Sequence, residues 1–307
     1  MQQQFAQISD LHLSSLEGID WRDFLNKRAL GYLSWKRKRQ FEHQMPVLDA
    51  LREDLQRHHL DQILVSGDLT HVGLPHEFEQ ARLWLEELDE PANIALVPGN
   101  HDAYVRSDWL ETFALWQAYM TSDSETPEAA DFTGFPTLRV RDGIAFIGLS
   151  TACPKPPLMA SGTVGKSQLA KLPEILASAG RDGLFRVVYL HHSPVVGEEK
   201  WRKRLTDAAA VTAIVARHGA ELILHGHGHR AHQSELVTDQ GARPVIAVPS
   251  ASAMGLGHGD VAAYNCYRVE PKEGNWQLEI ETRRFEKESD TFVPSHPQTL
   301  TIERWRS

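Results

Sequence analysis

The sequence predicts an α/β fold with two β-sheets, organised as a single domain over residues 1–307. Three observations carry this prediction. Short apolar runs alternate with segments of helical periodicity between residues 5 and 119, which is typical of parallel strands joined by helices. Two apolar runs flank a turn signal at residues 137–149, and residues 261–285 have the pattern of closing β-strands. Because both strand directions occur along the chain, mixed sheets are expected.

Between residues 5 and 119, short apolar runs alternate with segments whose apolar residues recur at the spacing of a helix. Pro75 marks the opening of one helix, and Ser107 is a candidate N-cap for another. The predicted strands are 5–9, 62–66 and 93–97, and the predicted helices are 45–55, 75–88 and 107–119. This strand–helix–strand order predicts a parallel sheet with helices outside it.

Beyond Pro136 the rhythm changes. Arg141-Asp142-Gly143 lies between two apolar runs and is a hairpin signal. Two further helices are each bordered by a strand, and the chain then continues in strands. The predicted helices are 166–179 and 208–218, and the predicted strands are 137–140, 144–149, 186–190, 221–224, 233–237, 244–248, 262–269 and 276–285. The last two strands are expected to close the chain as an antiparallel pair.

The composition fits a globular protein and narrows the classes of partner. Hydrophobic residues make up 41% of the chain and charged residues 24%. A net charge of −9 argues against broad nucleic-acid binding. The N-terminus lacks the basic and apolar regions of a signal peptide, and only two cysteines occur, so a cytoplasmic location is expected.

Five short polar motifs each follow an apolar run, and they are the main evidence about function. Functional groups collect beyond the carboxyl ends of the strands in an open α/β sheet, so these motifs are expected to meet at one site. Asp, Asn and His side chains offer oxygen and imidazole ligands, a set suited to Mn, Fe or Zn rather than Ca. The motifs are Asp10-Leu11-His12, Gly67-Asp68, Gly99-Asn100-His101-Asp102, His191-His192 and Gly226-His227-Gly228-His229.

This series of motifs resembles the calcineurin-like metallophosphoesterase superfamily, over residues 7–229 by motif. Within that superfamily, Gly-Asn-His-Asp combined with Gly-His-x-His is most similar to the bacterial class III cyclic-nucleotide phosphodiesterases. The resemblance implies a four-layer α-β-β-α sandwich, in which two mixed β-sheets are flanked by helices. It also implies a binuclear centre with two divalent metal ions, Mn or Fe foremost and Zn as an alternative.

The resemblance assigns a role to each polar residue of the motifs. One metal ion is implied to be held by Asp10, His12 and His229, the other by Asn100, His191 and His227, with Asp68 bridging both. His101 is implied to be the catalytic histidine that binds no metal, and Asp102 to orient that catalytic segment. His192 stays open as the alternative to His191, because only one of the two adjacent residues is expected to bind metal.

The implied reaction is the hydrolysis of a phosphate ester, in which a hydroxide that bridges the metals attacks phosphorus in line. His101 would steady a phosphate oxygen or protonate the leaving oxygen. The expected substrate is a small nucleotide-like or glycerophosphodiester-like diester. Two alternatives stay open: a phosphomonoesterase or pyrophosphatase acting on a nucleotide or lipid-linked sugar, and a metal-binding scaffold without catalysis.

Residues 16–44 interrupt the connection between the first strand and the first helix. This insertion combines aromatic side chains with the basic run Lys36-Arg37-Lys38-Arg39. Because it follows the first metal motif directly, it is expected to lie beside the site, either as a helical cap or as a lid that recruits an anionic substrate. Contact with a membrane surface through residues 16–44 and formation of a homodimer are further open expectations. The glycine-rich loop at residues 255–259 is a second place where substrate specificity is expected.

Overall fold

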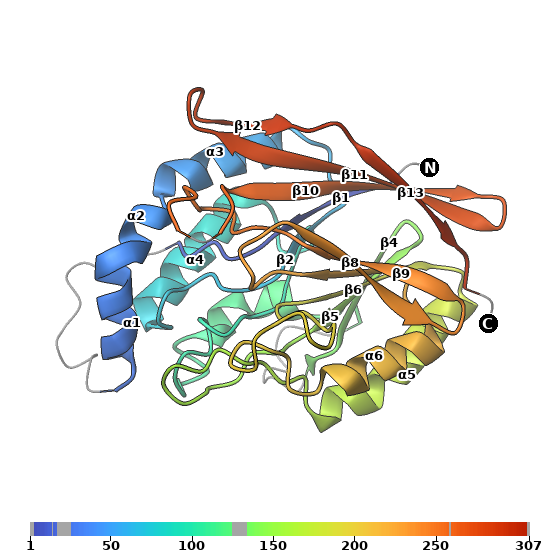
Figure 1. Cartoon of the computed structure of the whole chain (residues 1–307), viewed down its shortest axis with the longest axis horizontal. Helices are drawn as coiled ribbons and strands as arrows, with labels where there is room; N and C mark the ends of the chain where they lie inside the picture. Colours follow the sequence, from blue (N-terminus) through green and yellow to red (C-terminus); the bar gives the residue numbers. More distant parts are fainter. Residues whose placement is uncertain (1–2, 14, 17–25, 125–133, 258, 306–307) are drawn as a thin grey trace.

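The computed structural model has two mixed β-sheets packed face to face, with helices on the outer face of each (Figure 1). The residues that it describes are 3–13, 15–16, 26–124, 134–257 and 259–305. One helical layer contains α3 (Met45–Gln56) and α4 (Pro75–Leu88), and the other contains α5 (Lys166–Arg181) and α6 (Ala208–His218). The predicted α-β-β-α sandwich of two mixed sheets is therefore confirmed.

The first sheet joins the N-terminal strands to the C-terminal ones. Phe5 on its central strand lies opposite Gln62 in a parallel pair and opposite Tyr267 in an antiparallel pair. In order across the sheet, the strands are β12 (Thr291–Pro294), β11 (Asn275–Glu286), β10 (Ala263–Lys272), β1 (Gln3–Ile8), β2 (Gln62–Val65) and β3 (Ile94–Leu96), and β13 (Gln298–Glu303) also pairs with β11. Strands β1, β2 and β3 run in parallel, so their carboxyl ends share one edge.

The second sheet is built around four parallel strands with an antiparallel strand at each side. In order they are β4 (Thr137–Arg141), β5 (Ile144–Leu149), β6 (Phe185–Leu190), β7 (Leu222–His225), β9 (Gly241–Ala247) and β8 (His232–Thr238). The strands β4 and β5 form the hairpin expected around Asp142 and Gly143. The parallel run β5–β6–β7–β9 again gathers its carboxyl ends at one edge.

The main core has two parts: one extends from α3 and α4 across the first sheet into the space between the sheets, and the other lies beneath α5 and α6. Strand β6 shows why its sequence is apolar throughout: Val187 and Tyr189 pack between the sheets, whereas Val188 and Leu190 pack against α5 and α6. A parallel strand buried on both faces has no solvent side, so its residues do not alternate with polar ones. Between the sheets, the ring of Phe5 lies 5.1 Å from that of Phe146.

The structure differs from the sequence-based prediction in two elements. The segment predicted to be a helix from Ser107 to Tyr119 contains only the 3-10 helix η3 (Phe113–Met120), and the Ser107 hydroxyl donates to the Val105 carbonyl instead of capping a helix. The chain also does not close at residue 285, because β12 and β13 follow and both pair with β11. None of the helices in the described ranges has the length and apolar character needed to cross a membrane.

Residues 26–44 of the insertion are helical. They form α1 (Arg28–Ser34), the π-helix η2 (Trp35–Arg39) and α2 (Gln40–Glu42), drawn in dark blue in Figure 1. Residues 17–25 of the predicted insertion lie outside the described residues. The helices lie at the end of the sheets where β1 runs out, which places this part of the insertion beside the polar motifs.

Candidate metal centre

All five polar motifs lie at the carboxyl ends of parallel strands, and the two sheets bring these ends together. Asp10 and His12 follow β1, Asp68 follows β2, and the Asn100 segment follows β3. From the second sheet, His191 follows β6 and the Gly226–His229 segment follows β7. Hydrogen bonds join the sheets at this edge: His191 Nδ1 donates to the Ser66 carbonyl at 2.7 Å.

The motif residues have an unusual backbone conformation. Asp10, His12, Asp68, His227 and His229 all have positive φ, between 46° and 67°. This left-handed region is uncommon for residues other than glycine and costs free energy, so the surrounding structure has to hold it. Strained backbone of this kind is common at functional sites. Here the five candidate ligands with positive φ lie just after the ends of their strands.

Hydrogen bonds between the first two motif loops hold these conformations. Asp10 N–H donates to the Gly67 carbonyl at 2.8 Å, and His12 N–H donates to the Asp68 carbonyl at 3.1 Å. Gly226 lies so close to Ser9 that a Cβ atom there would fall 1.8 Å from the Ser9 hydroxyl. Glycine is therefore required at the start of the last motif by close packing.

Three groups of candidate ligands have their ligand atoms within 4.8 Å of one another. They are Asp10 with His12 and His229, Asp10 with Asp68 and His191, and His191 with His192 and His227. Asn100 Oδ1 lies 3.3 Å from His191 Nε2 and so belongs to the same region. The structure thus brings together every residue that the sequence predicts as a metal ligand.

The histidines present the chemistry that a transition-metal ion requires. His12 Nδ1 donates to the Thr70 carbonyl at 2.8 Å, which leaves a lone pair on Nε2. His12 Nε2 and His227 Nε2 are both buried and have no hydrogen-bond partner among the residues that the structure describes. Buried polar atoms almost always find a partner, so these two orphaned nitrogens fit a bound metal ion. The residues present therefore fit the implied binuclear centre.

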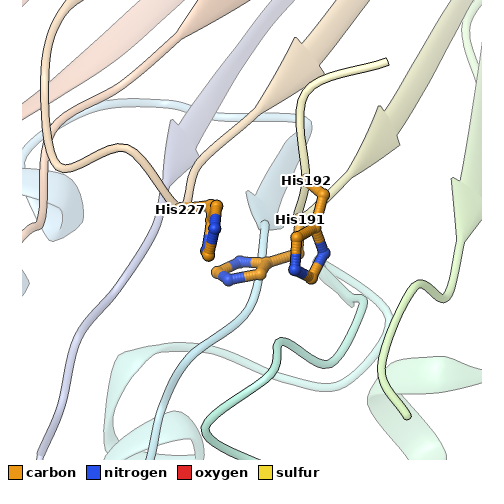
Figure 2. A group of neighbouring side chains, drawn as sticks. All are labelled: His191, His192 and His227. Carbon is orange, nitrogen blue, oxygen red and sulfur yellow. The ribbon is translucent and has the colours of Figure 1, made fainter. Parts of the chain in front are cut away.

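Figure 2 shows the adjacent His191 and His192 beside His227, and the hydrogen bonds of the first two favour His191 as the ligand. His192 Nε2 donates to the Ala160 carbonyl at 3.0 Å, and its Nδ1 lies 2.7 Å from the Thr151 hydroxyl. Both of its ring nitrogens therefore have protein partners. His191 Nδ1 also bonds to a main-chain carbonyl, but its Nε2 faces other candidate ligands, 3.2 Å from Asp68 Oδ2 and 3.3 Å from Asn100 Oδ1.

The charges of Asp68 and His191 are coupled. Burial alone would lower the pKa of His191, but the nearby carboxylate of Asp68 raises it to about 9. Burial would raise the pKa of Asp68, but His191 and His101 hold it below its ordinary value. A metal ion competes with the proton on such a ligand, so ion binding here has to release protons.

His101 lies beside the proposed bridging carboxylate. Its backbone N–H donates to Asp68 Oδ1 at 2.6 Å, and its Nδ1 donates to the His71 carbonyl at 2.6 Å. Nε2 therefore carries the lone pair, and it accepts from Arg39 Nη2 at 3.0 Å. Burial, followed by the charge of Arg39, lowers the pKa of His101 to about 3, so the imidazole is neutral in the ligand-free site.

Asp102 acts on the loops rather than on the reacting groups. Its carboxylate accepts four backbone N–H bonds, of 2.8–3.0 Å, from Gly99, Asp68, Leu69 and Thr70. Burial and the charge of Asp68 raise the pKa of Asp102 to about 7, and these hydrogen bonds oppose that rise. The structure places Asp102 as the anchor that joins the loops after β2 and β3.

Two further side chains near the site were given no individual role by sequence reasoning, although Arg39 belongs to the basic run described above. The His43 ring lies 4.5 Å from that of His12, and its Nδ1 lies 2.8 Å from the Ser252 hydroxyl. The Arg39 guanidinium contacts His101, as described above. Both residues belong to the insertion, where His43 follows no strand and Arg39 is one of four consecutive basic residues. The available signals were the basic run for Arg39 and, for both residues, their position between the first motif and helix α3.

The loop at residues 252–257 packs on the end of the insertion. Glu42 accepts hydrogen bonds from Gly255 N–H and Leu256 N–H, both at 2.9 Å. The loop therefore borders the site together with the insertion. His258, the histidine of this loop, lies outside the described residues.

Comparison with known proteins identifies the family of this chain. The family model for calcineurin-like phosphoesterases matches residues 4–231, which contain all five motifs. A curated protein of Synechococcus sp., named a "probable cyclic nucleotide phosphodiesterase", is 28% identical over 239 residues. That match covers 76% of this chain and 82% of the relative.

A solved structure shares the fold across the whole chain. The crystal structure of a dimetal phosphatase from Danio rerio matches with a TM-score of 0.64 and 13% sequence identity. The match covers 99% of each chain. At this identity the likeness shows that the two proteins share an architecture.

Proposed function

This chain belongs to the calcineurin-like phosphoesterase family and is a metal-dependent phosphoric ester hydrolase, and from this premise we propose that it cleaves small phosphodiesters. The proposed substrate is nucleotide-like or glycerophosphodiester-like. The similarity to the Synechococcus protein supports the choice of a diester. Family membership also argues for an enzyme over a metal-binding scaffold.

The observation that carries the mechanism is the placement of His101. Its main chain holds Asp68, and its side chain is oriented through Nδ1 by the His71 carbonyl. Nε2 is therefore the atom that contacts a phosphoryl oxygen or, once protonated, gives its proton to the leaving oxygen. A negatively charged substrate favours the protonated imidazole and so supports this second role.

The metal ligands are proposed from the same geometry. Asp10, His12 and His229 would hold one ion, Asn100, His191 and His227 the other, and Asp68 would bridge both. Mn or Fe is proposed because the set combines imidazoles with hard oxygen ligands, and Zn is the alternative. Such a pair of ions activates water and neutralises charge on the phosphoryl oxygens.

A panel of phosphate esters tests this proposal. Protein reconstituted with Mn is given cyclic nucleotides, bis(p-nitrophenyl) phosphate, the matching monoester, and nucleotide sugars with a pyrophosphate bond. The expected result is the highest kcat/KM on a diester. A preference for the monoester or for the pyrophosphate bond would replace the diesterase with the corresponding alternative.

The variant His101→Ala tests the catalytic role of that residue separately from metal binding. We expect it to lose about 10²- to 10⁴-fold in kcat, the usual contribution of a positioned acid or base. Metal content should stay that of the wild type, because His101 is not a proposed ligand. Equal activity of the variant and the wild type would refute its role.

A lipid-linked substrate at a membrane surface is the second candidate, favoured by the outer face of the insertion. Leu30, Leu33 and Phe41 are each about half exposed or more, and Lys36, Arg37 and Lys38 beside them are exposed. Basic and apolar side chains on one face suit an anionic lipid surface. Co-sedimentation with vesicles containing phosphatidylserine tests this, with phosphatidylcholine vesicles as the control. Equal recovery with both would reject the candidate.

The cytoplasm is the proposed location. Cys153 and Cys266, the two cysteines of the chain, are free thiols, and free thiols suit a reducing compartment. A homodimer also remains a proposal, tested by the mass of the protein in solution.

A further inference from the structure

One basic residue of the insertion turns toward the active site while its neighbours face solvent. Lys36, Arg37 and Lys38 are exposed, whereas Arg39, the last residue of η2, is half-buried. Its Nη1 and Nη2 atoms lie 3.1 and 3.0 Å from the two ring nitrogens of His101. Since His101 Nδ1 already donates to a carbonyl, the hydrogen bond is the one from Nη2 to Nε2.

The chain just beyond Arg39 is fixed to the body of the protein. His43 N–H donates to the Arg39 carbonyl at 2.9 Å and continues the helical turn. Gln44 N–H donates to the Ser252 carbonyl at 3.2 Å, and Met254 N–H donates to the Glu42 carbonyl at 2.8 Å. Together with the two bonds that Glu42 accepts from the 255–256 backbone, these contacts hold the end of η2 in place.

The chain before Arg39 is anchored as well. Trp35 is buried in a small apolar cluster with Leu16, Val72 and Leu74. Gly31 of α1 lies so close to this cluster that a Cβ atom there would fall 2.5 Å from Val72 Cγ1. The position of the Arg39 guanidinium is therefore built into the fold, unlike that of an exposed side chain.

The Arg39 guanidinium is buried near carboxylates and has N–H donors beyond the one that His101 uses. Burial lowers the pKa of Arg39, and the charges of Asp68 and Asp10 oppose that fall. A guanidinium has five N–H donors in a planar fork that matches two oxygens of a phosphate, and it stays charged at every physiological pH. Among the described residues, Arg39 is hydrogen-bonded to His101 through one of these donors, so others are available to an anion.

Resting on the proposed function, we propose that Arg39 is a substrate-binding residue whose guanidinium binds a nonbridging oxygen of the phosphoryl group on the His101 side of the site. Residues 26–44 thereby contribute a fixed positive charge to the reaction. Arg39 also positions His101, because the same fork holds Nε2 until the substrate arrives.

The test compares Arg39→Gln and Arg39→Lys with Arg57→Gln, a control whose side chain is 63% exposed at the end of α3. For Mn-loaded protein with bis(p-nitrophenyl) phosphate, Arg39→Gln is expected to lower kcat/KM by about 10- to 100-fold, the usual effect of losing a charged hydrogen bond. The loss should appear largely in KM. Arg39→Lys should recover part of it, and Arg57→Gln should match the wild type.

Binding of inorganic phosphate gives a readout that does not depend on turnover. Titration calorimetry on the metal-loaded proteins should show about tenfold weaker phosphate binding for Arg39→Gln, with wild-type metal content and melting temperature. Adding guanidinium ion to Arg39→Ala should restore part of the phosphate affinity. Unchanged phosphate affinity and KM in Arg39→Gln would overturn the proposal.

The two proposals fail in different ways. A wild-type protein that hydrolyses no ester in the panel would contradict the proposed function, while the phosphate titration would still decide the role of Arg39. Conversely, an active wild type with an unaffected Arg39→Gln variant would reject Arg39 alone. If Arg39→Gln has an altered metal content or melting temperature, Arg39→Lys is used in its place. Arg39→Lys keeps the positive charge and removes only the planar arrangement of guanidinium donors.

Discussion

The backbone N–H of His101 donates to Asp68 Oδ1 at 2.6 Å, so the candidate catalytic residue and the candidate bridging ligand are held by one hydrogen bond. The bond joins the loop after β3 to the loop after β2. Any change to the Asp68 carboxylate therefore acts on the metal centre and on the position of His101 together.

Asp68→Asn is expected to lower the occupancy of both metal sites, because one carboxylate serves two ions. Loss of a group that only supports a ligand costs about 10- to 100-fold in metal affinity, and loss of a shared ligand should cost at least as much. Elemental analysis after dialysis measures the occupancy. Asp49→Asn, which changes an exposed carboxylate on α3, is the control. Two full equivalents of metal in Asp68→Asn would contradict the bridging role.

His191→Ala and His192→Ala separate the two adjacent histidines. We expect His191→Ala to lose metal from one site, because its Nε2 faces Asp68 and Asn100. His192→Ala should keep the metals, since both of its ring nitrogens have protein partners. Metal content is measured for both variants under the same dialysis conditions. Metal loss in His192→Ala alone would reverse the assignment.

Asp102→Asn is expected to destabilise the loops around the site. The amide that replaces one carboxylate oxygen is a donor, and it would face the backbone N–H groups that the carboxylate accepts. Leaving such buried donors unsatisfied costs about 1–3 kcal/mol each. Urea unfolding of the metal-free protein measures the loss. A free energy of unfolding equal to that of the wild type would show that Asp102 does not anchor these loops.

Glu221→Ala is expected to destabilise the fold without changing KM. The Arg186–Glu221 pair is almost fully buried, with side chains 1% and 2% exposed, and Arg186 is at the opposite end of β6 from His191. Removing one partner of a buried pair costs about 3–5 kcal/mol because it strands the other charge.

Glu174→Ala is the matched control for that variant. Its partner is Arg181, and the side chains of Glu174 and Arg181 are 77% and 58% exposed, so the expected cost is only about 0–1 kcal/mol. Thermal or urea unfolding compares the two variants. If Glu221→Ala and Glu174→Ala lower the free energy of unfolding by the same amount, burial does not set the strength of the Arg186–Glu221 pair.

Much of the fold was predictable because buried parallel strands are short apolar runs that stand out from their surroundings. Every predicted strand from β1 to β11 is present in the structure. The prediction was wrong at η3, whose sequence Phe113–Met120 is apolar on most sides and so lacks a helical stripe. It also missed β12 and β13, which are short and mostly exposed. Pro294, at the end of β12, is a further signal against a strand. These two strands exist because β11 is long enough to pair with both.

The sequence by itself determined the ligand chemistry and its placement at strand ends, since residue types and apolar runs are local properties. Only the tertiary structure decided which groups meet. It joined His191 of one sheet to Asp68 of the other, and it satisfied both nitrogens of His192 with a hydroxyl and a carbonyl. It also turned Arg39, one of four consecutive basic residues, onto His101. The availability of a ring nitrogen or a guanidinium depends on neighbours that are distant in the chain, and packing alone brings those neighbours together.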